Sequence, residues 1–245
     1  MKFLLLIIPL LFCACTVKPL VDIGLDKTPR PFADSGKATF ADYKKKWPIV
    51  KNRKVDRVTD RLTKVLPTTE DGWEVITFNF KNPNAFALPG GKIGINQGLL
   101  PLTHTDSELA TVIAHEAAHI LKNHHFERDS RARVLSLIAK LPQQTEQQRA
   151  RYEALKEKLT HDLPELSEME LEADRVGLIY MARAGYNPRE AIAFWERFAG
   201  FRDHHGLTHE SDLETHPNDR SRITNLLALL PYAIKEYQRS PYKPQ

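Results

Sequence analysis

The sequence of 245 residues predicts a helix-dominated α+β fold in which a small, mostly antiparallel sheet packs beside one central helix. Two observations lead to this fold. Apolar residues recur at helical spacing in long segments, most clearly in residues 105–121 and 167–185. Ahead of these segments, residues 73–80 are rich in β-formers, and Gly90 and Gly91 mark a turn between two short apolar runs.

The N-terminus has the pattern of a cleaved export signal. Lys2 precedes an apolar run over residues 3–12, which is too short to span a bilayer because a span takes about 20 residues. Ala14 followed by Cys15 is similar to the site at which bacterial lipoproteins are cleaved and lipidated. We therefore predict a signal peptide over residues 1–14 and a palmitate-bearing lipid anchor on Cys15.

The residue after the predicted cleavage site bears on location. Thr16, in place of aspartate, is similar to lipoproteins that are sent on to the outer membrane. The pattern therefore predicts a lipid-anchored protein on the periplasmic side of the bacterial cell envelope, at the outer membrane. Two alternatives stay open, namely secretion without a lipid and a Cys13–Cys15 pair of no consequence.

The remaining chain is long enough for one well-buried domain, and 42% of the sequence is hydrophobic. We predict a tether over residues 15–38 and a single domain over residues 39–240. Between residues 44 and 64, Val55 and Val58 mark an amphipathic helix whose basic residues face solvent. The net charge of +4 is modest, so we expect no binding to nucleic acid.

The most informative pattern is His-Glu-Ala-Ala-His at residues 115–119, in a helix that Thr105 can cap. Positions i and i+4 of a helix lie on the same face, so His115 and His119 can bind one zinc ion. The side chain of Glu116 projects roughly 100° around the helix axis, where it can take a proton from zinc-bound water. The spacing therefore predicts a metallopeptidase.

A catalytic zinc site has three protein ligands and one open position, so a third ligand is needed. His125 has the spacing of a pattern in which a glycine ends the helix and returns a third histidine to the metal. Lys122 occupies that glycine position here. We therefore interpret His124 and His125 as the solvated end of the helix.

A second helix, which Ser167 can cap, offers a better third ligand. Glu170 and Asp174 are four residues apart and share one face, so the first can bind zinc while the second accepts the spare N–H of a ligand histidine. The alternative is an ordinary acidic first turn, which is how we interpret Glu168 and Glu172. Three further helices are expected over residues 143–162, 187–198 and 217 to about 230.

The order of these segments resembles a known family. A His-Glu-x-x-His motif followed some fifty residues later by Glu-Leu-Glu-Ala-Asp is similar to the membrane-associated zinc endopeptidases that include the CAAX prenyl protease, the HtpX heat-shock protease and bacterial periplasmic lipoprotein peptidases. Residues 84–96 resemble the strand and turn that precede the metal helix in this family. Residues 215–223 resemble its late active-site motif.

The resemblance implies a zincin-type (gluzincin) metallopeptidase with one zinc ion per chain. It implies zinc ligands at His115, His119 and Glu170, the base at Glu116 and the supporting acid at Asp174.

The late motif adds two candidate catalytic residues, His216 and Arg222, either of which could stabilise the oxyanion of the tetrahedral intermediate. His216 is explained equally well as a capping residue before a helix that begins with Pro217.

These observations predict an endopeptidase that uses Glu116 and zinc-bound water to cleave misfolded or misassembled envelope proteins while attached to the membrane through Cys15. The substrates follow from the resemblance alone. The alternative is a lipid-anchored chaperone or assembly factor in which the zinc is structural.

Overall fold

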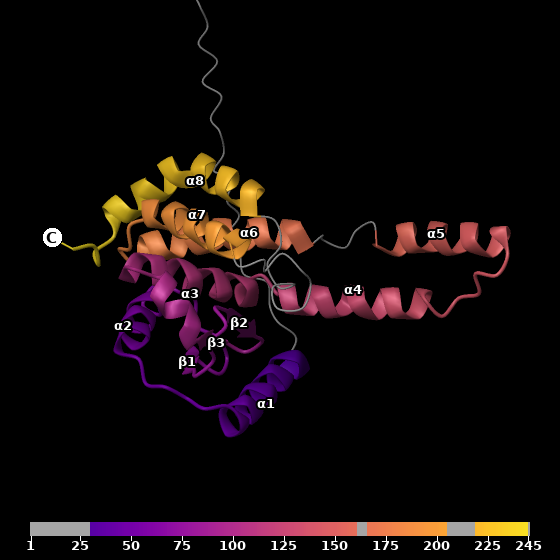
Figure 1. The fold of residues 1–245 in the computed structure, drawn as a ribbon, viewed down its shortest axis with the longest axis horizontal. Coiled ribbons are helices and arrows are strands. Elements are labelled where there is room, and N and C mark those ends of the chain that lie inside the picture. The colour runs from indigo at the N-terminus through magenta and orange to yellow at the C-terminus, as the bar shows by residue number, and fades with distance from the viewer. Residues whose placement is uncertain (1–29, 161–165, 205–218, 245) are drawn as a thin grey trace, which may run out of the picture.

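The structure is a computed structural model and describes residues 30–160, 166–204 and 219–244 (Figure 1). Its central element is helix α3 (Asp106–Leu121), which lies between two layers. One layer consists of a three-stranded sheet and helix α2 (Arg53–Leu62). The other layer, on the opposite side of α3, consists of the helices α6 (Leu166–Arg183), α7 (Arg189–His204) and α8 (Asp219–Arg239). The predicted helix-dominated α+β fold with a small sheet beside the central helix is confirmed.

The sheet has the order β1-β3-β2, with β1 at Glu74–Phe78, β2 at Ala85–Leu88 and β3 at Lys92–Asn96. β2 and β3 are antiparallel and joined by a turn at Gly90 and Gly91, whose φ angles of 84° and 81° lie in the region that glycine adopts without strain. β1 pairs with β3 in parallel. The sheet is therefore mixed where the sequence led us to expect a mostly antiparallel one, because β1 runs parallel to the central strand β3 and β2 runs antiparallel to it.

Helix α3 begins as its sequence predicts. The Thr105 side chain accepts a hydrogen bond from the Glu108 amide at 3.2 Å, and the Glu108 carboxylate accepts one from the His104 amide at 2.6 Å. Together these bonds satisfy donors that a helix start leaves unpaired. Every residue from Glu108 to Leu121 is buried. The two histidines of the motif therefore lie in the interior of the molecule.

Helix α6 packs along α3 at very short range. A Cβ atom added at Gly177 would lie only 2.9 Å from the backbone nitrogen of His115. The described part of α6 begins at Leu166, so Ser167 lies inside the helix and not at the predicted N-cap position. The predicted stop at Gly185 is present, with a φ of 76°.

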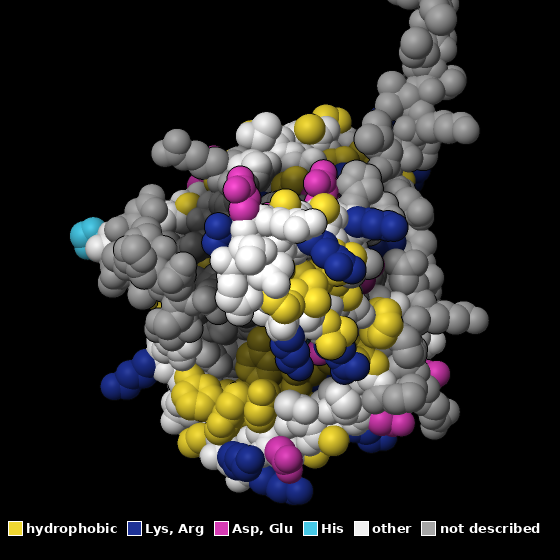
Figure 2. All heavy atoms as spheres, turned by 90° about the vertical axis from the view of Figure 1, so that its right-hand side faces the viewer, with side chains coloured by type: hydrophobic (Ala, Val, Ile, Leu, Met, Phe, Trp, Pro, Cys, Tyr) yellow, Lys and Arg dark blue, Asp and Glu magenta, His cyan; other side chains and the backbone are white. Residues whose placement is uncertain are grey.

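Helices α4 (His124–Ile138) and α5 (Glu146–Thr160) form a hairpin that projects from the body as an arm (Figure 1). α5 corresponds to the charged helix expected in this region. α4 was not expected, and it follows directly on Asn123, whose φ of 59° is left-handed and separates it from α3. Leu137 and Leu141 near the outer end of the arm are exposed, and Figure 2 views the molecule from this side.

The N-terminal part of the described chain is helical. Helix α1 (Arg30–Lys46) occupies residues 30–38 of the predicted tether and packs its Phe40 ring on Phe78 of the sheet at 6.0 Å. Helix α2 has the predicted apolar face, with Val55 and Val58 buried. α7 and α8 run beyond the ends that the sequence predicted.

The predicted signal peptide over residues 1–14 and the predicted lipid anchor at Cys15 lie outside the described residues. In the part of the chain that the structure describes, none of the helices combines the length and the apolar character needed to cross a bilayer.

Candidate metal centre

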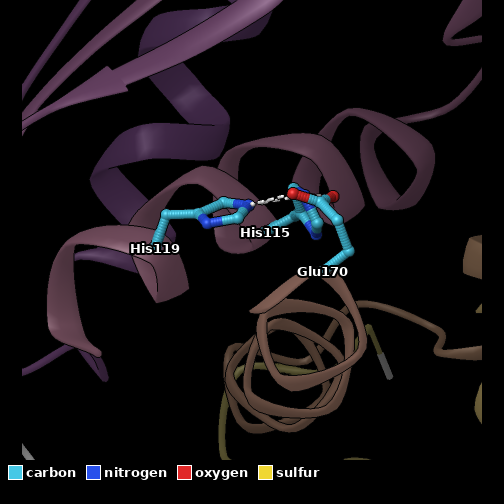
Figure 3. A group of neighbouring side chains, drawn as sticks. All are labelled: His115, His119 and Glu170. Carbon is cyan, nitrogen blue, oxygen red and sulfur yellow. Dashed lines mark hydrogen bonds and ion pairs between the residues drawn. The ribbon is translucent and has the colours of Figure 1, made fainter. Parts of the chain in front are cut away.

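Three buried side chains converge between α3 and α6 (Figure 3). The Nε2 atoms of His115 and His119 are 3.0 Å apart. Glu170 reaches across from α6 and places Oε2 3.3 Å from Nε2 of His115 and Oε1 3.3 Å from Nε2 of His119. Each of the three residues is 2–3% exposed. Among the described residues, this is the group whose geometry allows it to hold a metal ion.

The donor set fits zinc. Two ligands that are each about 2.1 Å from a tetrahedral zinc ion lie about 3.4 Å apart. The observed separations of 3.0 to 3.3 Å are close to this value. Two imidazoles and one carboxylate are one of the usual sets of protein ligands in a catalytic zinc site, which keeps a fourth position open. A divalent cation would also offset the cost of burying the Glu170 carboxylate.

On the side of His115, the supporting group is an ion pair. Oδ1 of Asp174 is 3.0 Å from Nδ1 of His115. Arg222 donates from Nε and Nη2 to the two oxygens of Asp174, both at 2.7 Å, and its guanidinium lies 3.8 Å from the ring centroid of Trp195. Burial raises the pKa of Asp174, but the charge and hydrogen bonds of Arg222 outweigh it and lower the pKa to about 2. Asp174 is therefore ionised and can hold a proton on Nδ1 of His115.

Two predicted catalytic residues can be placed. Glu116 is buried on α3, next to His115 in the chain. Arg222 is 1% exposed, and Nη1 lies 3.6 Å from Oε2 of Glu170. It thus approaches the centre from the side of α8 with two of its donors on Asp174. The third candidate, His216, lies outside the described residues.

His125 is not part of the converging group. Its ring centroid is 6.3 Å from that of His119, and the set of ligand atoms that could share one ion contains Glu170 in its place.

On the side of His119, the structure shows residues that the sequence did not indicate. His124, which we expected at a solvated helix end, is 1% exposed and places Nδ1 2.9 Å from Nδ1 of His119. Its Nε2 lies 3.1 Å from Oε2 of Glu172, whose other oxygen is 3.2 Å from Nζ of Lys122. Burial raises the pKa of Glu172, but the hydrogen bonds of His124 and Lys122 outweigh it and lower that pKa.

The signal for His124 was the residue before it. Asparagine tolerates the left-handed conformation that ends many helices, so Asn123 indicates a break after α3. A chain that turns at Asn123 can return the next side chain toward the last turn of α3. His124 then need not face solvent.

The histidine pair on one helix, the carboxylate from a second helix and the small sheet beside them define a zinc metallopeptidase of the zincin type. Comparison with known proteins identifies the family. Residues 50–230 match the sequence profile of Peptidase family M48, and the chain belongs to this family.

Relatives of known name are found in eukaryotes and bacteria. The chain is 38% identical to the mitochondrial metalloendopeptidase OMA1 of Saccharomyces cerevisiae over 173 residues, which are 69% of this chain and 50% of that protein. It is 32% identical to OMA1 of Arabidopsis thaliana over 212 residues, 80% of this chain and 40% of that protein. It is 28% identical to the beta-barrel assembly-enhancing protease of Escherichia coli over 152 residues, 58% and 31% of the two chains. The chain thus spans half or less of the length of these relatives.

These comparisons correct the predicted location. The OMA1 relatives are named as mitochondrial proteins, which contradicts a location at the bacterial outer membrane. The prediction was based on residues 1–16. A short apolar run after a basic residue resembles many targeting signals, so it does not specify the membrane to which a chain is sent.

Proposed function

We propose that the chain is a zinc-dependent endopeptidase in which Glu116 activates the attacking water. The observation that carries this proposal is the convergence of His115, His119 and Glu170 within 4.8 Å, with Glu116 beside them in the chain. Membership of Peptidase family M48 supports it. Zinc bound by the three side chains would act as a Lewis acid toward the scissile carbonyl and the water.

The residues of the chain then have distinct roles. The Glu116 carboxylate takes a proton from the attacking water and passes it to the nitrogen of the leaving amine. The Asp174 carboxylate accepts a hydrogen bond from the Nδ1–H of His115, which leaves Nε2 available as a ligand. Because Arg222 donates to both oxygens of Asp174, we propose that it positions this carboxylate and that the oxyanion is stabilised elsewhere.

The proposed substrates are misfolded or misassembled polypeptides. The name of the Escherichia coli relative, a beta-barrel assembly-enhancing protease, supports a role in protein quality control. The match covers 58% of this chain and 31% of that relative, so the substrate class requires its own test. Profiling of cleaved peptides against folded and unfolded versions of one protein would provide it.

We also propose that Cys15 carries a lipid that attaches the chain to a membrane. The support is the small residue before this cysteine and the apolar run ahead of it. Labelled palmitate should be incorporated into the wild-type chain and not into Cys15→Ala. Equal labelling of the two chains would contradict the anchor and would leave the peptidase proposal untouched.

The peptidase proposal is tested by Glu116→Gln. The variant should bind one equivalent of zinc and cleave unfolded casein at least about 100-fold more slowly than wild type, since general-base catalysis contributes 10²- to 10⁴-fold. Glu168→Gln is the matched control. Glu168 is exposed on α6, so this variant should cleave casein at the wild-type rate. A Glu116→Gln variant that binds zinc and cleaves at the wild-type rate would contradict the role of Glu116 as the base. Zinc-loaded wild type that does not cleave at all would favour the alternative of a chaperone with a structural zinc site.

A further inference from the structure

A chain of four side chains extends from the second ligand histidine to the surface. It runs from His119 to His124, then to Glu172 and finally to Lys122, with atom separations of 2.9, 3.1 and 3.2 Å. Three of its members are at most 7% exposed, and Glu172 keeps 32% of its side chain accessible. The four residues come from the end of α3, the turn after it, the start of α4 and the middle of α6.

The hydrogen bonds that link these four side chains can have only one direction when His119 binds a metal through Nε2. A neutral imidazole that uses Nε2 as a ligand carries its proton on Nδ1. The Nδ1–H of His119 must then donate a hydrogen bond to Nδ1 of His124. Nδ1 of His124 is therefore unprotonated, and the proton of this ring is on Nε2. Nε2 of His124 in turn donates to the Glu172 carboxylate, which also accepts from the Lys122 ammonium.

We propose that His124 is a positioning residue that holds the ring and the tautomer of His119, with Glu172 and Lys122 holding His124 in turn. The inference rests on the proposed zinc ligation by His119. It adds to that proposal an explanation of why His124 is buried and why an acidic residue stands two positions after the ligand Glu170.

The two ligand histidines are therefore supported in different ways. Nδ1 of His115 meets a carboxylate directly, whereas Nδ1 of His119 meets a second imidazole that stands between it and a carboxylate. The groups that orient ligand histidines typically affect metal affinity 10- to 100-fold. His124 should contribute an effect of this size, and Glu172, one step further from the metal, a smaller one.

Zinc affinity, measured by competition with a chromophoric chelator, tests the proposal without reference to activity. His124→Ala should weaken zinc binding about 10- to 100-fold, and Glu172→Gln should weaken it less. His104→Ala and Glu168→Gln are the matched controls, since both side chains are exposed, and should bind as wild type. Binding by His124→Ala that is as tight as binding by His104→Ala would overturn the proposal.

A conservative variant separates positioning from packing. In His124→Asn the amide oxygen takes the place of Nδ1 and can still accept the hydrogen bond from Nδ1–H of His119. The hydrogen bond from residue 124 to Glu172 is lost. We expect His124→Asn to bind zinc more tightly than His124→Ala. A role in packing alone predicts no such rescue, so equal weakening in the two variants would contradict positioning.

The tautomers can also be observed in the unaltered, zinc-loaded protein, which keeps the test valid if a variant fails to fold. Long-range ¹H–¹⁵N correlation of the imidazoles should show His119 protonated on Nδ1 and His124 protonated on Nε2. A proton on Nδ1 of His124 would overturn the proposal. His119→Ala identifies a failure of the metal site itself, because undiminished zinc binding in that variant would refute the ligand assignment.

Discussion

At the scale of single residues, the metal centre brings two carboxylates, two imidazoles and one guanidinium together in the interior. Glu170 is 2% exposed and Asp174 is 3% exposed; Arg222 pairs with Asp174 at 2.7 Å, and its Nη1 lies 3.6 Å from Oε2 of Glu170. Isolated buried charges are costly unless they are paired or bind a metal. A zinc ion at the three converging side chains would bind the Glu170 carboxylate directly and so offset the cost of burying it. The arrangement of charges therefore favours a bound metal, beyond the match in ligand type.

The choice of third ligand leads to a direct prediction. Glu170→Ala should lose stoichiometric zinc, because it removes the carboxylate that lies 3.3 Å from both Nε2 atoms. His125→Ala should retain zinc, since the converging group does not include His125. Metal content after dialysis, measured by atomic emission, checks both variants. Retention of zinc by Glu170→Ala together with its loss from His125→Ala would reverse the assignment.

The low pKa of Asp174 predicts a pH dependence of stability. A carboxyl group whose pKa falls from 3.8 in the unfolded chain to about 2 in the fold stabilises the fold above about pH 4. This contribution is about 2 kcal/mol and is lost as the pH falls from 4 to 2. The difference in free energy of unfolding between wild type and Asp174→Asn should therefore shrink in this window.

Urea unfolding of both proteins with a chelator present measures this difference, because the chelator removes the separate effect of zinc release. At neutral pH the variant should be clearly less stable, since it leaves the Arg222 guanidinium buried without its partner carboxylate. A difference that stays constant from pH 6 to pH 2 would show that Asp174 does not titrate as proposed.

At the scale of elements, the contact between α3 and α6 sets the geometry of the metal centre, because each helix contributes ligands. The two backbones approach most closely at Gly177, where an added methyl group would lie 2.9 Å from the His115 nitrogen and 3.0 Å from the Ala114 carbonyl carbon. Gly177→Ala should therefore push the helices apart. We expect a loss of about 1–3 kcal/mol in the free energy of unfolding, as for other overpacked cores, together with weaker zinc binding.

Gly200→Ala is the control for this variant. Gly200 lies in α7 with no heavy atom near the position of an added methyl group. Alanine there should leave zinc binding unchanged and stabilise the protein by up to about 1 kcal/mol through helix propensity. Denaturant unfolding and chelator competition on the two variants separate crowding from the general effect of replacing glycine by alanine. Equal stabilisation in both would show that α3 and α6 tolerate a wider spacing.

Local signals explain which elements could be predicted from the sequence. The cap at Thr105, the apolar face of α2 and the stop at Gly185 depend on neighbouring residues, and all three are present in the structure. The parallel direction of β1 relative to β3 could not be predicted, because it depends on how the chain between the two strands crosses the sheet. Helix α1 escaped notice because prolines precede it and its apolar residues are few.

The same distinction applies to the site. The i, i+4 spacing of the histidine pair and of Glu170 with Asp174 is a local property, so the pattern indicated which faces could meet. The burial of His124 depends on the turn at Asn123 and on Glu172 of α6, which is distant in sequence. No local periodicity contains that contact.

At the scale of the whole molecule, the apolar core and the metal centre coincide, whereas the arm lies apart. The core cluster includes buried residues of α3, α6, α7 and α8, and among the described residues it includes none from α5. α5 packs mainly against α4. Segments with few buried apolar contacts open at low free energy without global unfolding. The arm should therefore be the least stable of the described helical regions.

Native-state hydrogen exchange tests this division of the molecule and links it to the metal. Amides of α3 and α6 should exchange only through global unfolding, and amides of α5 through a much cheaper local opening. Zinc binds the folded state, so removing it with a chelator should lower the protection of α3 and α6 by RT ln(1 + [Zn]/Kd). The protection of α5 should stay the same, because its local opening does not expose the ligands on α3 and α6. If α5 instead lost protection in step with α3, the arm would be energetically coupled to the metal centre through α4, which carries His124 at its first position.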